Sequence, residues 1–191
     1  MRTLTTRAFA IALAGLALPL VTACGSSGTE DKSGAALQSD VTRSMATVIN
    51  DVEGLSTLNA VMSGAEIGSI FDGPGSYTLL APNDAAFKAL GAKADELASV
   101  GQRPILVALL RKHTLPGHLT PANIRAAIEQ KGGPVTMTTL GESKVTFALD
   151  GETLTVAADN GVKATLTETA TEANNGVIIP VSKVLIADGA E

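Results

Sequence analysis

Few side chains in this sequence are suited to catalysis or metal binding: there is one cysteine, Cys24, and there are two histidines, His113 and His118. A single cysteine excludes an intramolecular disulfide and a C-x-x-C pair. Two histidines with no cluster of carboxylates beside them in the sequence do not provide the ligands of a typical zinc site. The sequence therefore predicts neither a metal site nor a bound cofactor.

The two histidines are the candidates for a catalytic base, since a Ser-His-Asp site has a geometry that sequence does not reveal. His113 falls four residues after Leu109 on the apolar face of a predicted helix, where a histidine is usually a hydrogen-bonded core residue. His118 follows Gly117 in a predicted turn and is expected to be solvated. The G-x-S-x-G, H-E-x-x-H, P-loop and G-x-G-x-x-G motifs do not occur. We therefore predict no enzymatic activity, with a hydrolase that uses His113 as the alternative.

Cys24 stands at the end of a segment typical of export signals. Arg2 and Arg7 give a charged start, and residues 8–21 carry no charge, a run shorter than the roughly 18–20 residues that span a bilayer. Val, Thr and Ala then precede Cys24, as in the bacterial lipobox, whose cysteine is lipidated and becomes the new N-terminus. The alternative is an ordinary secretory signal with an incidental cysteine. We predict that residues 1–23 are removed and that Cys24 carries a lipid.

A flexible tether is predicted after the lipidated cysteine, over residues 24–39, because this stretch is rich in Gly, Ser and charge. Its r.m.s. reach is roughly 20 Å. The folded domain is expected over residues 40–188, with a short tail at 189–191. This organisation predicts a domain held close to the cell membrane on its extracytoplasmic face, with release from the membrane left open.

Charge and aromatic content argue against a nucleic-acid partner. The formal net charge is −5, and removing Arg2 and Arg7 with the signal segment changes it to about −7, which opposes attraction to DNA or anionic membrane. The chain has no Trp, one Tyr and four Phe, so aromatic platforms for stacking bases are not expected. The core must therefore be aliphatic, and we predict no nucleic-acid binding.

The run YTLLAPNDAAFKAL, residues 77–90, predicts a buried strand followed by the start of a helix. A Gly/Pro/Ser cluster precedes the run, and Pro82 ends the strand because proline has no N–H for a sheet ladder. Asn83 and Asp84 come next, and either side chain can cap the helix on which Phe87 and Leu90 share a face.

Helical periodicity dominates the first two thirds of the domain. Apolar residues recur at intervals of three and four over residues 41–71, and a short helix is expected over 94–100. Pro104 opens another helix, and Thr120, which precedes a proline, is a cap for a helix over 122–129. Four residues of the helix at Pro104 are expected to mark its apolar face: Ile105, Leu106, Leu109 and Leu110.

Strands dominate the last third. From Val135 the apolar period changes to two, and Asp-Gly at 150–151 and Asn-Gly at 160–161 are hairpin signals that predict an antiparallel meander. A further turn at 174–176 leads into an apolar strand over 177–181. Because helices and strands are segregated along the chain, the predicted fold class is α+β.

Three segments resemble the signatures of fasciclin domains. Residues 77–87, YTLLAPNDAAF, resemble a strand followed by Ala-Pro-Thr/Asn-Asp/Asn-x-Ala-Phe. Residues 109–117, LLRKHTLPG, resemble the helix that ends in Tyr-His with a following Pro-Gly, and residues 174–186, NNGVIIPVSKVLI, resemble the closing Asn-Gly-x-Ile-His-x-Ile-Asp-x-Val-Leu. The segments occur in the family's order and cover about residues 41–186, so the chain is identified as a member of the fasciclin-domain family.

The resemblance implies a small β-sandwich-like core with a helical layer. It also implies candidate binding residues, since the Tyr-His motif and the closing segment have been implicated in adhesion by fasciclin domains. Lys112 stands at the tyrosine position here. The alternative is a structural role, in which His113 orients the end of a helix and Asn83 caps the start of another. The candidate binding residues are His113, Asn83, Asp84, Ile178 and Ile179.

Bacterial lipoproteins of the family, including surface antigens of mycobacteria, resemble this chain in having a lipobox, a short tether and a single domain. The resulting prediction is a membrane-anchored extracytoplasmic binding module, acting in adhesion or in binding a protein or glycan. The alternative is a carrier or sensor of an apolar small molecule or envelope lipid. A cavity between the helical layer and the sandwich would favour the carrier, and a solid core would oppose it.

Overall fold

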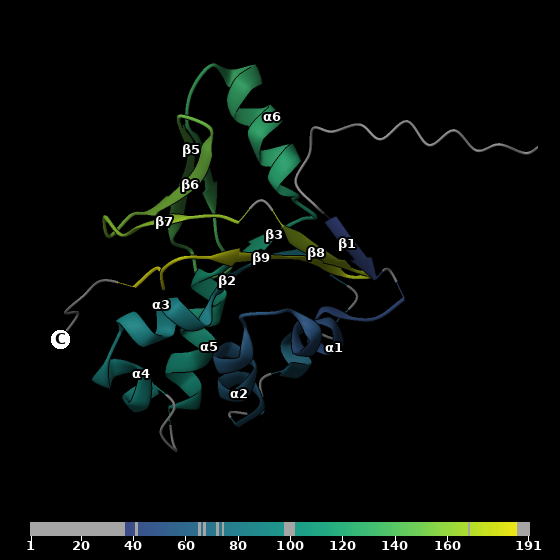
Figure 1. The fold of residues 1–191 in the computed structure, drawn as a ribbon, viewed down its shortest axis with the longest axis vertical. Helices are drawn as coiled ribbons and strands as arrows, with labels where there is room; N and C mark the ends of the chain where they lie inside the picture. Colours follow the sequence, from purple (N-terminus) through teal and green to yellow (C-terminus); the bar gives the residue numbers. More distant parts are fainter. Residues whose placement is uncertain are drawn as a thin grey trace, which may run out of the picture. The chain divides into compact units, whose positions relative to one another are not determined.

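The described residues form two β-sheets and a set of helices, which confirms the α+β class (Figure 1). The expected signal segment, Cys24, most of the expected tether and the tail at 189–191 lie outside the described residues. The computed structural model describes residues 37–40, 42–64, 66, 68–71, 73, 75–97, 102–167 and 169–186.

One sheet has five strands, in the spatial order β1 (Leu37–Asp40), β8 (Ala170–Ala173), β9 (Gly176–Val181), β2 (Tyr77–Pro82) and β3 (Thr114–Pro116). The neighbours β2 and β9 run parallel, although they come from different halves of the chain. β1 pairs parallel with β8, whereas β8–β9 and β2–β3 are antiparallel pairs. This mixed sheet brings the first and third family signatures side by side.

The other sheet is an antiparallel meander, with β4 (Val135–Thr138), β5 (Lys144–Asp150), β6 (Thr153–Ala158) and β7 (Lys163–Thr165) in chain order. The Asp-Gly turn joins β5 to β6, and Asp150 lies opposite Thr153. Gly151 and Gly161 have φ values of 62° and 86°, which side chains rarely allow and glycine adopts freely. Both predicted hairpins are therefore confirmed.

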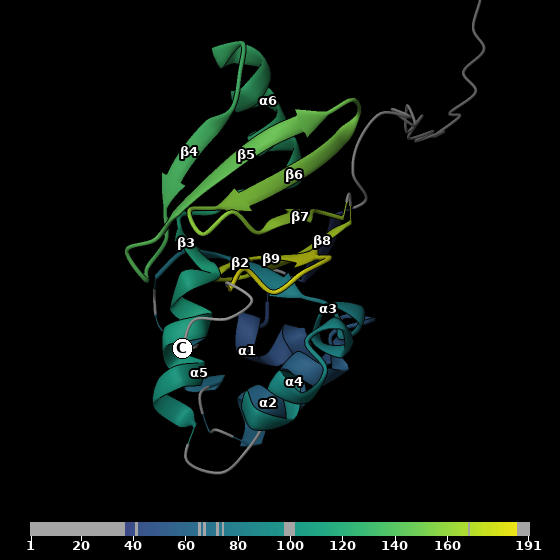
Figure 2. The same cartoon turned by 90° about the vertical axis from the view of Figure 1, so that its left-hand side faces the viewer.

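The helices lie on two sides of the five-stranded sheet. Figure 2 shows α1 to α5 on one side, and α6 beside the four-stranded sheet on the other. Thr120 caps α6 as predicted, since its Oγ1 accepts the N–H of Asn123 at 3.1 Å. The helical segments are α1 (Met45–Val48), η1 (Ile49–Asp51), α2 (Ser56–Gly64), η2 (Gly68–Phe71), α3 (Asp84–Ala89), α4 (Ala92–Leu97), α5 (Arg103–Lys112) and α6 (Pro121–Lys131).

The buried side chains form two hydrophobic clusters, one on each side of the five-stranded sheet. Leu79 and Ile178 belong to the helical cluster, which packs against α1 to α5. Leu80 and Ile179 belong to the sheet cluster, which contains residues of β5, β6 and α6. All four side chains have no exposed surface. A sheet covered on both faces needs central strands with apolar residues on each face, which explains why successive residues of β2 and β9 are apolar on both sides of the sheet.

Three boundaries differ from the sequence-based expectations. Residues 37–39, expected at the end of the tether, lie in β1, so the structured part of the chain begins earlier than residue 40. The cause is backbone pairing with β8, which leaves no apolar pattern in the sequence. The helix expected over 94–100 begins earlier, at Ala92, and is described as far as Leu97; residues 98–100 lie outside the described part of the chain. β3 was not predicted because three residues are too short to show a period.

Ile105 corrects the predicted apolar face of α5. Leu106, Leu109 and Leu110 are buried as expected, but the side chain of Ile105 is 53% exposed. The buried stripe of α5 continues instead to His113, which is fully buried at the end of the helix. Ile105 therefore lies at the border of this stripe and faces solvent.

Candidate functional site

His113 is the C-cap residue of α5, and both of its ring nitrogens are engaged. Nδ1 donates to the carbonyl oxygen of Leu109 at 2.8 Å, and Nε2 accepts the N–H of Leu185 at 2.8 Å. One donating and one accepting nitrogen correspond to the neutral imidazole. Burial lowers the pKa of His113 from 6.5 to about 4; the Leu109 carbonyl opposes this shift, and the charge of Lys112 adds to it.

This geometry supports the structural interpretation of His113. A general base must be able to reach a substrate proton, and here the ring is buried with each nitrogen already bonded within the protein. Leu185 is held from its other side as well, because Nδ2 of Asn160 donates to its carbonyl oxygen at 3.3 Å. The histidine thus connects α5 to the segment that follows β9.

Asn83 and Asp84 cap two different helices. Oδ1 of Asn83 accepts the N–H of Ala86 at 2.8 Å and so caps α3, as one of the sequence alternatives predicted. Asp84 instead reaches the start of α2, where Oδ1 accepts the N–H of Thr57 at 2.7 Å and Oδ2 accepts the hydroxyl of Ser56 at 2.8 Å. The bond from the Thr57 backbone is the main reason why the pKa of Asp84 lies below 3.8.

The five residues nominated by the resemblance are not brought together on one exposed surface. His113, Ile178 and Ile179 are buried, and the two isoleucines belong to different hydrophobic clusters. Asn83 and Asp84 are half-buried and engaged in helix caps. The structure therefore gives these residues positions in the scaffold and does not assemble a binding site from them.

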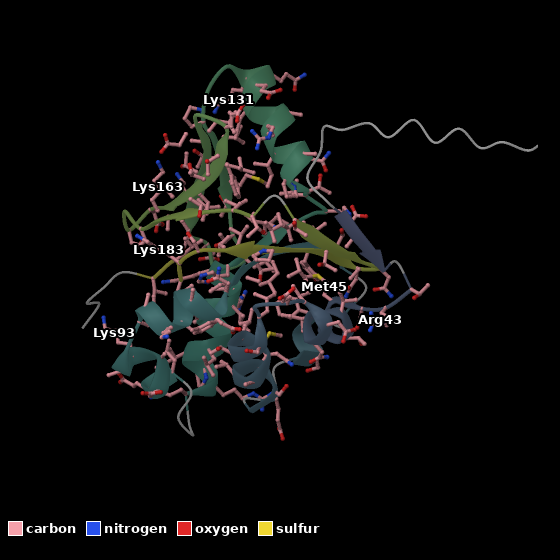
Figure 3. The ribbon with its side chains drawn as sticks, in the orientation of Figure 1. Arg43, Met45, Lys93, Lys131, Lys163 and Lys183 are labelled. Carbon is pink, nitrogen blue, oxygen red and sulfur yellow. The ribbon has the colours of Figure 1, made fainter. Side chains whose placement is uncertain are left out.

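Sequence reasoning missed Asn175 as a further structural residue. Its Oδ1 accepts the N–H of Met45 at 2.8 Å, at the start of α1, and its Nδ2 donates to the carbonyl oxygen of Phe71. Met45 itself lies between α1 and the five-stranded sheet (Figure 3). The signal was present as an Asn-Asn-Gly turn, but its long-range hydrogen bonds depend on the fold.

The structure opens a groove beside Ile105, which we call the Ile105 groove. Its volume is about 450 Å³. Residues from α4, α5, β5, β6 and the segment after β9 line it, so it lies where helices and the four-stranded sheet approach one another. The apolar residues that define it are Leu97, Ile105, Val145, Ala158, Leu185 and Ile186.

Four charged residues also line the Ile105 groove: Lys93, Glu96, Lys112 and Asp159. Figure 3 shows Lys93 projecting from the helical layer. Asp159 is engaged, because Oδ2 accepts the N–H of Lys144 at 3.2 Å, and Glu96 also has an interaction partner. Within the described part of the chain, Lys93 and Lys112 form no ion pair. The two lysines and the two carboxylates that line the groove balance one another in formal charge.

The other histidine takes part in a surface contact. Nε2 of His118 lies 3.2 Å from Oε1 of Glu172, and the histidine side chain is 42% exposed. Across the described residues, no group of three or more His, Cys, Asp and Glu side chains is placed to hold a metal ion. No helix in those same ranges has the length and apolar run that crossing a bilayer requires.

The fold and the three signatures define a class of protein that comparison with known families identifies. The Fasciclin domain model matches residues 53–187, and the chain therefore belongs to the fasciclin-domain family. The match includes β2, α5 and β9, the elements that carry the three signatures.

Individual relatives extend the comparison. Protein sll1483 of Synechocystis sp. is 28% identical over 183 residues, with 92% of each chain covered. Transforming growth factor-beta-induced protein ig-h3 of Sus scrofa is 28% identical over 153 residues, which are 80% of this chain and 21% of that relative. The FAS1 domain pair of the insect cell adhesion molecule fasciclin I has 20% identity and a TM-score of 0.48, over 73% of this chain and 43% of that one. This chain thus spans about a fifth of the length of the Sus scrofa protein and less than half of the length of the fasciclin I chain.

Proposed function

We propose that this chain is a membrane-anchored binding module on the extracytoplasmic face of the cell envelope, acting in adhesion or in binding a protein or glycan. The observation that carries the proposal is the Ile105 groove, because an apolar surface left open on a well-packed domain is typical of a binding site. Membership of the fasciclin-domain family supports the same function, because motifs of fasciclin domains have been implicated in adhesion. The sequence around Cys24 supports the lipid anchor.

The anchor and the groove are tested separately. Membrane fractionation of cells that express the Cys24→Ala variant should move the protein from the membrane to the soluble fraction. A variant that stays in the membrane fraction would contradict the lipid anchor. For the groove, cells displaying the Ile105→Asp variant should lose retention on the extracellular protein or glycan that retains the parent.

Ala108→Asp is the matched control for Ile105→Asp. Ala108 is exposed on the same helix and does not line the Ile105 groove, so its substitution adds the same charge away from the groove. Equal loss of retention in both variants would contradict a role for the groove. Equal surface amounts of the three proteins, measured with an antibody, are needed for the comparison.

A second candidate function is that of a carrier or sensor of an apolar small molecule. The volume of about 450 Å³ favours it, because small-molecule sites commonly occupy about 300–1,000 Å³ and are mostly apolar. Native mass spectrometry of the chain, purified gently from a bacterial envelope, distinguishes the two. A stoichiometric apolar adduct would favour the carrier, and a mass without adduct would favour adhesion.

A further inference from the structure

The strand β4 is an open edge of the four-stranded sheet. It pairs with β5 on one side and, within the described residues, with no strand on the other (Figure 2). An edge strand can pair with another chain unless charged residues, proline or a covering segment block it. β4 has the sequence Val-Thr-Met-Thr, which contains no charged residue and no proline. Nothing in the strand itself therefore prevents a further strand from pairing with it.

The backbone of β4 presents unpaired hydrogen-bonding groups at this edge. The N–H of Thr139 donates to the carbonyl oxygen of Ser143 at 2.9 Å, which fixes the phase of the ladder between β4 and β5. Because bonded pairs alternate along an antiparallel ladder, Met137 bonds to β5, and the N–H and C=O groups of Thr136 and Thr138 point to the open edge. In the described part of the chain these groups have no other partner.

Two other edge strands of the domain are blocked. β3 ends at Pro116, and the carbonyl oxygen of Thr114 already accepts the N–H of Leu140 at 2.8 Å. On β7, the carbonyl oxygen of Thr165 accepts the N–H of Ser182 at 3.0 Å. Segments of the same chain therefore cover β3 and β7, whereas β4 is left open.

A second copy of β4 fits this edge in one register. If the two sheets continue with their buried faces on the same side, residues that face the same side must lie opposite each other. Antiparallel pairing of Thr136 with Thr138 of the second copy meets this condition and uses the free N–H and C=O groups of both threonines in each copy. The two-fold axis then passes at Met137, whose half-buried side chain packs against the sheet cluster and would meet its symmetry mate.

The charges at the two ends of β4 favour this antiparallel arrangement. Lys131 precedes the strand, at the end of α6 (Figure 3), and Glu142 follows it; both side chains are exposed. Nζ of Lys131 donates to the carbonyl oxygen of Pro134 at 2.7 Å, and neither Lys131 nor Glu142 forms an ion pair within the described residues. An antiparallel pair brings the lysine end of one copy to the glutamate end of the other, whereas a parallel pair would bring like charges together.

We propose that β4 is a self-association edge, through which two copies of this chain pair antiparallel and join their four-stranded sheets. This inference goes beyond the proposed function, because it involves neither the Ile105 groove nor a ligand. The net charge of −5 opposes the approach of two copies, and a strand of four residues buries less than a standard interface. The dimer is therefore weak, with a dissociation constant between about 1 μM and about 1 mM.

Sedimentation velocity tests the proposal on the predicted mature chain, residues 24–191, with Cys24→Ser. This substitution removes the lipid and any intermolecular disulfide. The weight-average sedimentation coefficient should rise toward that of a dimer between about 1 μM and about 1 mM. In NMR spectra of the same chain, solvent exchange of the N–H groups of Thr136 and Thr138 should slow severalfold as the dimer forms. The N–H of Met137, which is bonded to β5, should be equally protected at all concentrations.

Thr136→Pro tests the backbone pairing, because proline removes an N–H that the dimer uses. The dissociation constant should increase at least about tenfold. Thr136→Val is the matched control: it loses the same hydroxyl contact with Oγ1 of Thr146 but keeps the N–H, so it should still dimerise. Circular dichroism and urea unfolding show whether both variants are folded.

Charge reversal tests the antiparallel direction without changing the strand. Glu142→Lys and Lys131→Glu should each weaken self-association about threefold to tenfold, because like charges then meet at both ends of the pair. An equal mixture of these two variants should associate as well as the parent, since one copy then carries two lysines and the other two glutamates. Glu152→Lys is the control, because Glu152 is exposed in the turn between β5 and β6 and its replacement makes the same change in net charge.

Three results would overturn the proposal. A chain that stays monomeric up to about 1 mM excludes self-association at β4. A dimer that Thr136→Pro leaves intact while the variant is folded, or one that leaves exchange at Thr136 and Thr138 unchanged, has its contact elsewhere. Failure of the mixed charge variants to associate excludes the antiparallel direction. The Ile105 groove and the lipid anchor are tested with other residues, so their failure and the failure of this proposal are distinguishable.

Discussion

The side chain of His113 and the backbone of Leu185 are joined by a hydrogen bond of 2.8 Å between Nε2 and the peptide nitrogen. Nδ1 of the same ring is bonded to Leu109, one turn back in α5. The ring therefore connects the end of α5 to the segment after β9, and that segment forms part of the floor of the Ile105 groove. A side chain that often serves as a catalytic base is here part of the scaffold and hydrogen-bonds two segments of the chain.

Replacing His113 with alanine should destabilise the domain by about 2–4 kcal/mol, because it leaves the N–H of Leu185 and the carbonyl of Leu109 without this partner and opens a cavity. Urea unfolding followed by circular dichroism measures the change. His118→Ala is the control, since that side chain is 42% exposed and should change stability by less than about 0.5 kcal/mol. Equal stability of His113→Ala and the parent would contradict the structural role.

Stability should fall as the pH drops from about 6.5 to about 4. In the folded chain the pKa of His113 is about 4, against 6.5 for an unperturbed histidine, so within this window the unfolded chain binds the proton and the folded chain does not. Stability therefore rises with pH across the window, and about 3 kcal/mol is lost on acidification. Urea unfolding at pH 7.5, 6, 5 and 4 checks this.

The control for the pH dependence is the His113→Gln variant, which has no ionisable group at this position. Its stability should be lower at neutral pH but much flatter between pH 6.5 and 4. A parent and a variant with parallel pH profiles would show that other groups cause the acid sensitivity.

Replacing Asp84 with alanine should cost about 1–2 kcal/mol, because α2 loses the carboxylate that accepts the N–H of Thr57 and the hydroxyl of Ser56. The lowered pKa of Asp84 means that its stabilisation is present above about pH 4 and is lost as the pH falls through the folded-state pKa. Thermal unfolding at pH 7 and at pH 2.5 should therefore show a smaller difference between variant and parent in acid. Asp95→Ala, an exposed change in the first turn of α4, should have little effect at either pH.

Gly176→Ala should be among the most damaging single-methyl changes in the domain. A Cβ at this position would lie 2.1 Å from the carbonyl oxygen of Tyr77 and 2.3 Å from Sδ of Met45, so β9 would have to move away from β2. We expect a loss of at least about 2 kcal/mol, measured by urea unfolding. Gly133→Ala is the control, because a Cβ there meets no atom within 4 Å, and a similar loss in both variants would contradict the steric explanation.

Features that depend on neighbouring residues could be predicted from the sequence. The turns at Gly151 and Gly161, the cap at Thr120 and the meander follow from local backbone preferences and an alternating apolar pattern. The α+β class follows from the order of these segments, and family membership follows from the three signatures.

Features that depend on long-range contacts could not be predicted. The parallel pairing of β2 with β9 and of β1 with β8 joins segments whose sequences carry no information about their partners. Asp84 was correctly placed at a helix start, but the helix that it caps is α2, which lies earlier in the chain. The Ile105 groove was missed because Ile105 has the same apolar character as its buried neighbours, and periodicity does not locate the border of a helix face.

The sequence by itself therefore determined most of the helices and strands, the fold class and the family, because turn chemistry, capping and apolar period act between residues close in the chain. Only the tertiary structure decided that the His113 ring is neutral and hydrogen-bonds α5 to the segment after β9. It also decided that residues of the two clusters line one open groove, and that Lys93 and Lys112 form no ion pair within the described residues. These properties arise from the burial and charge that distant segments create when they pack together, and no local pattern in the chain records them.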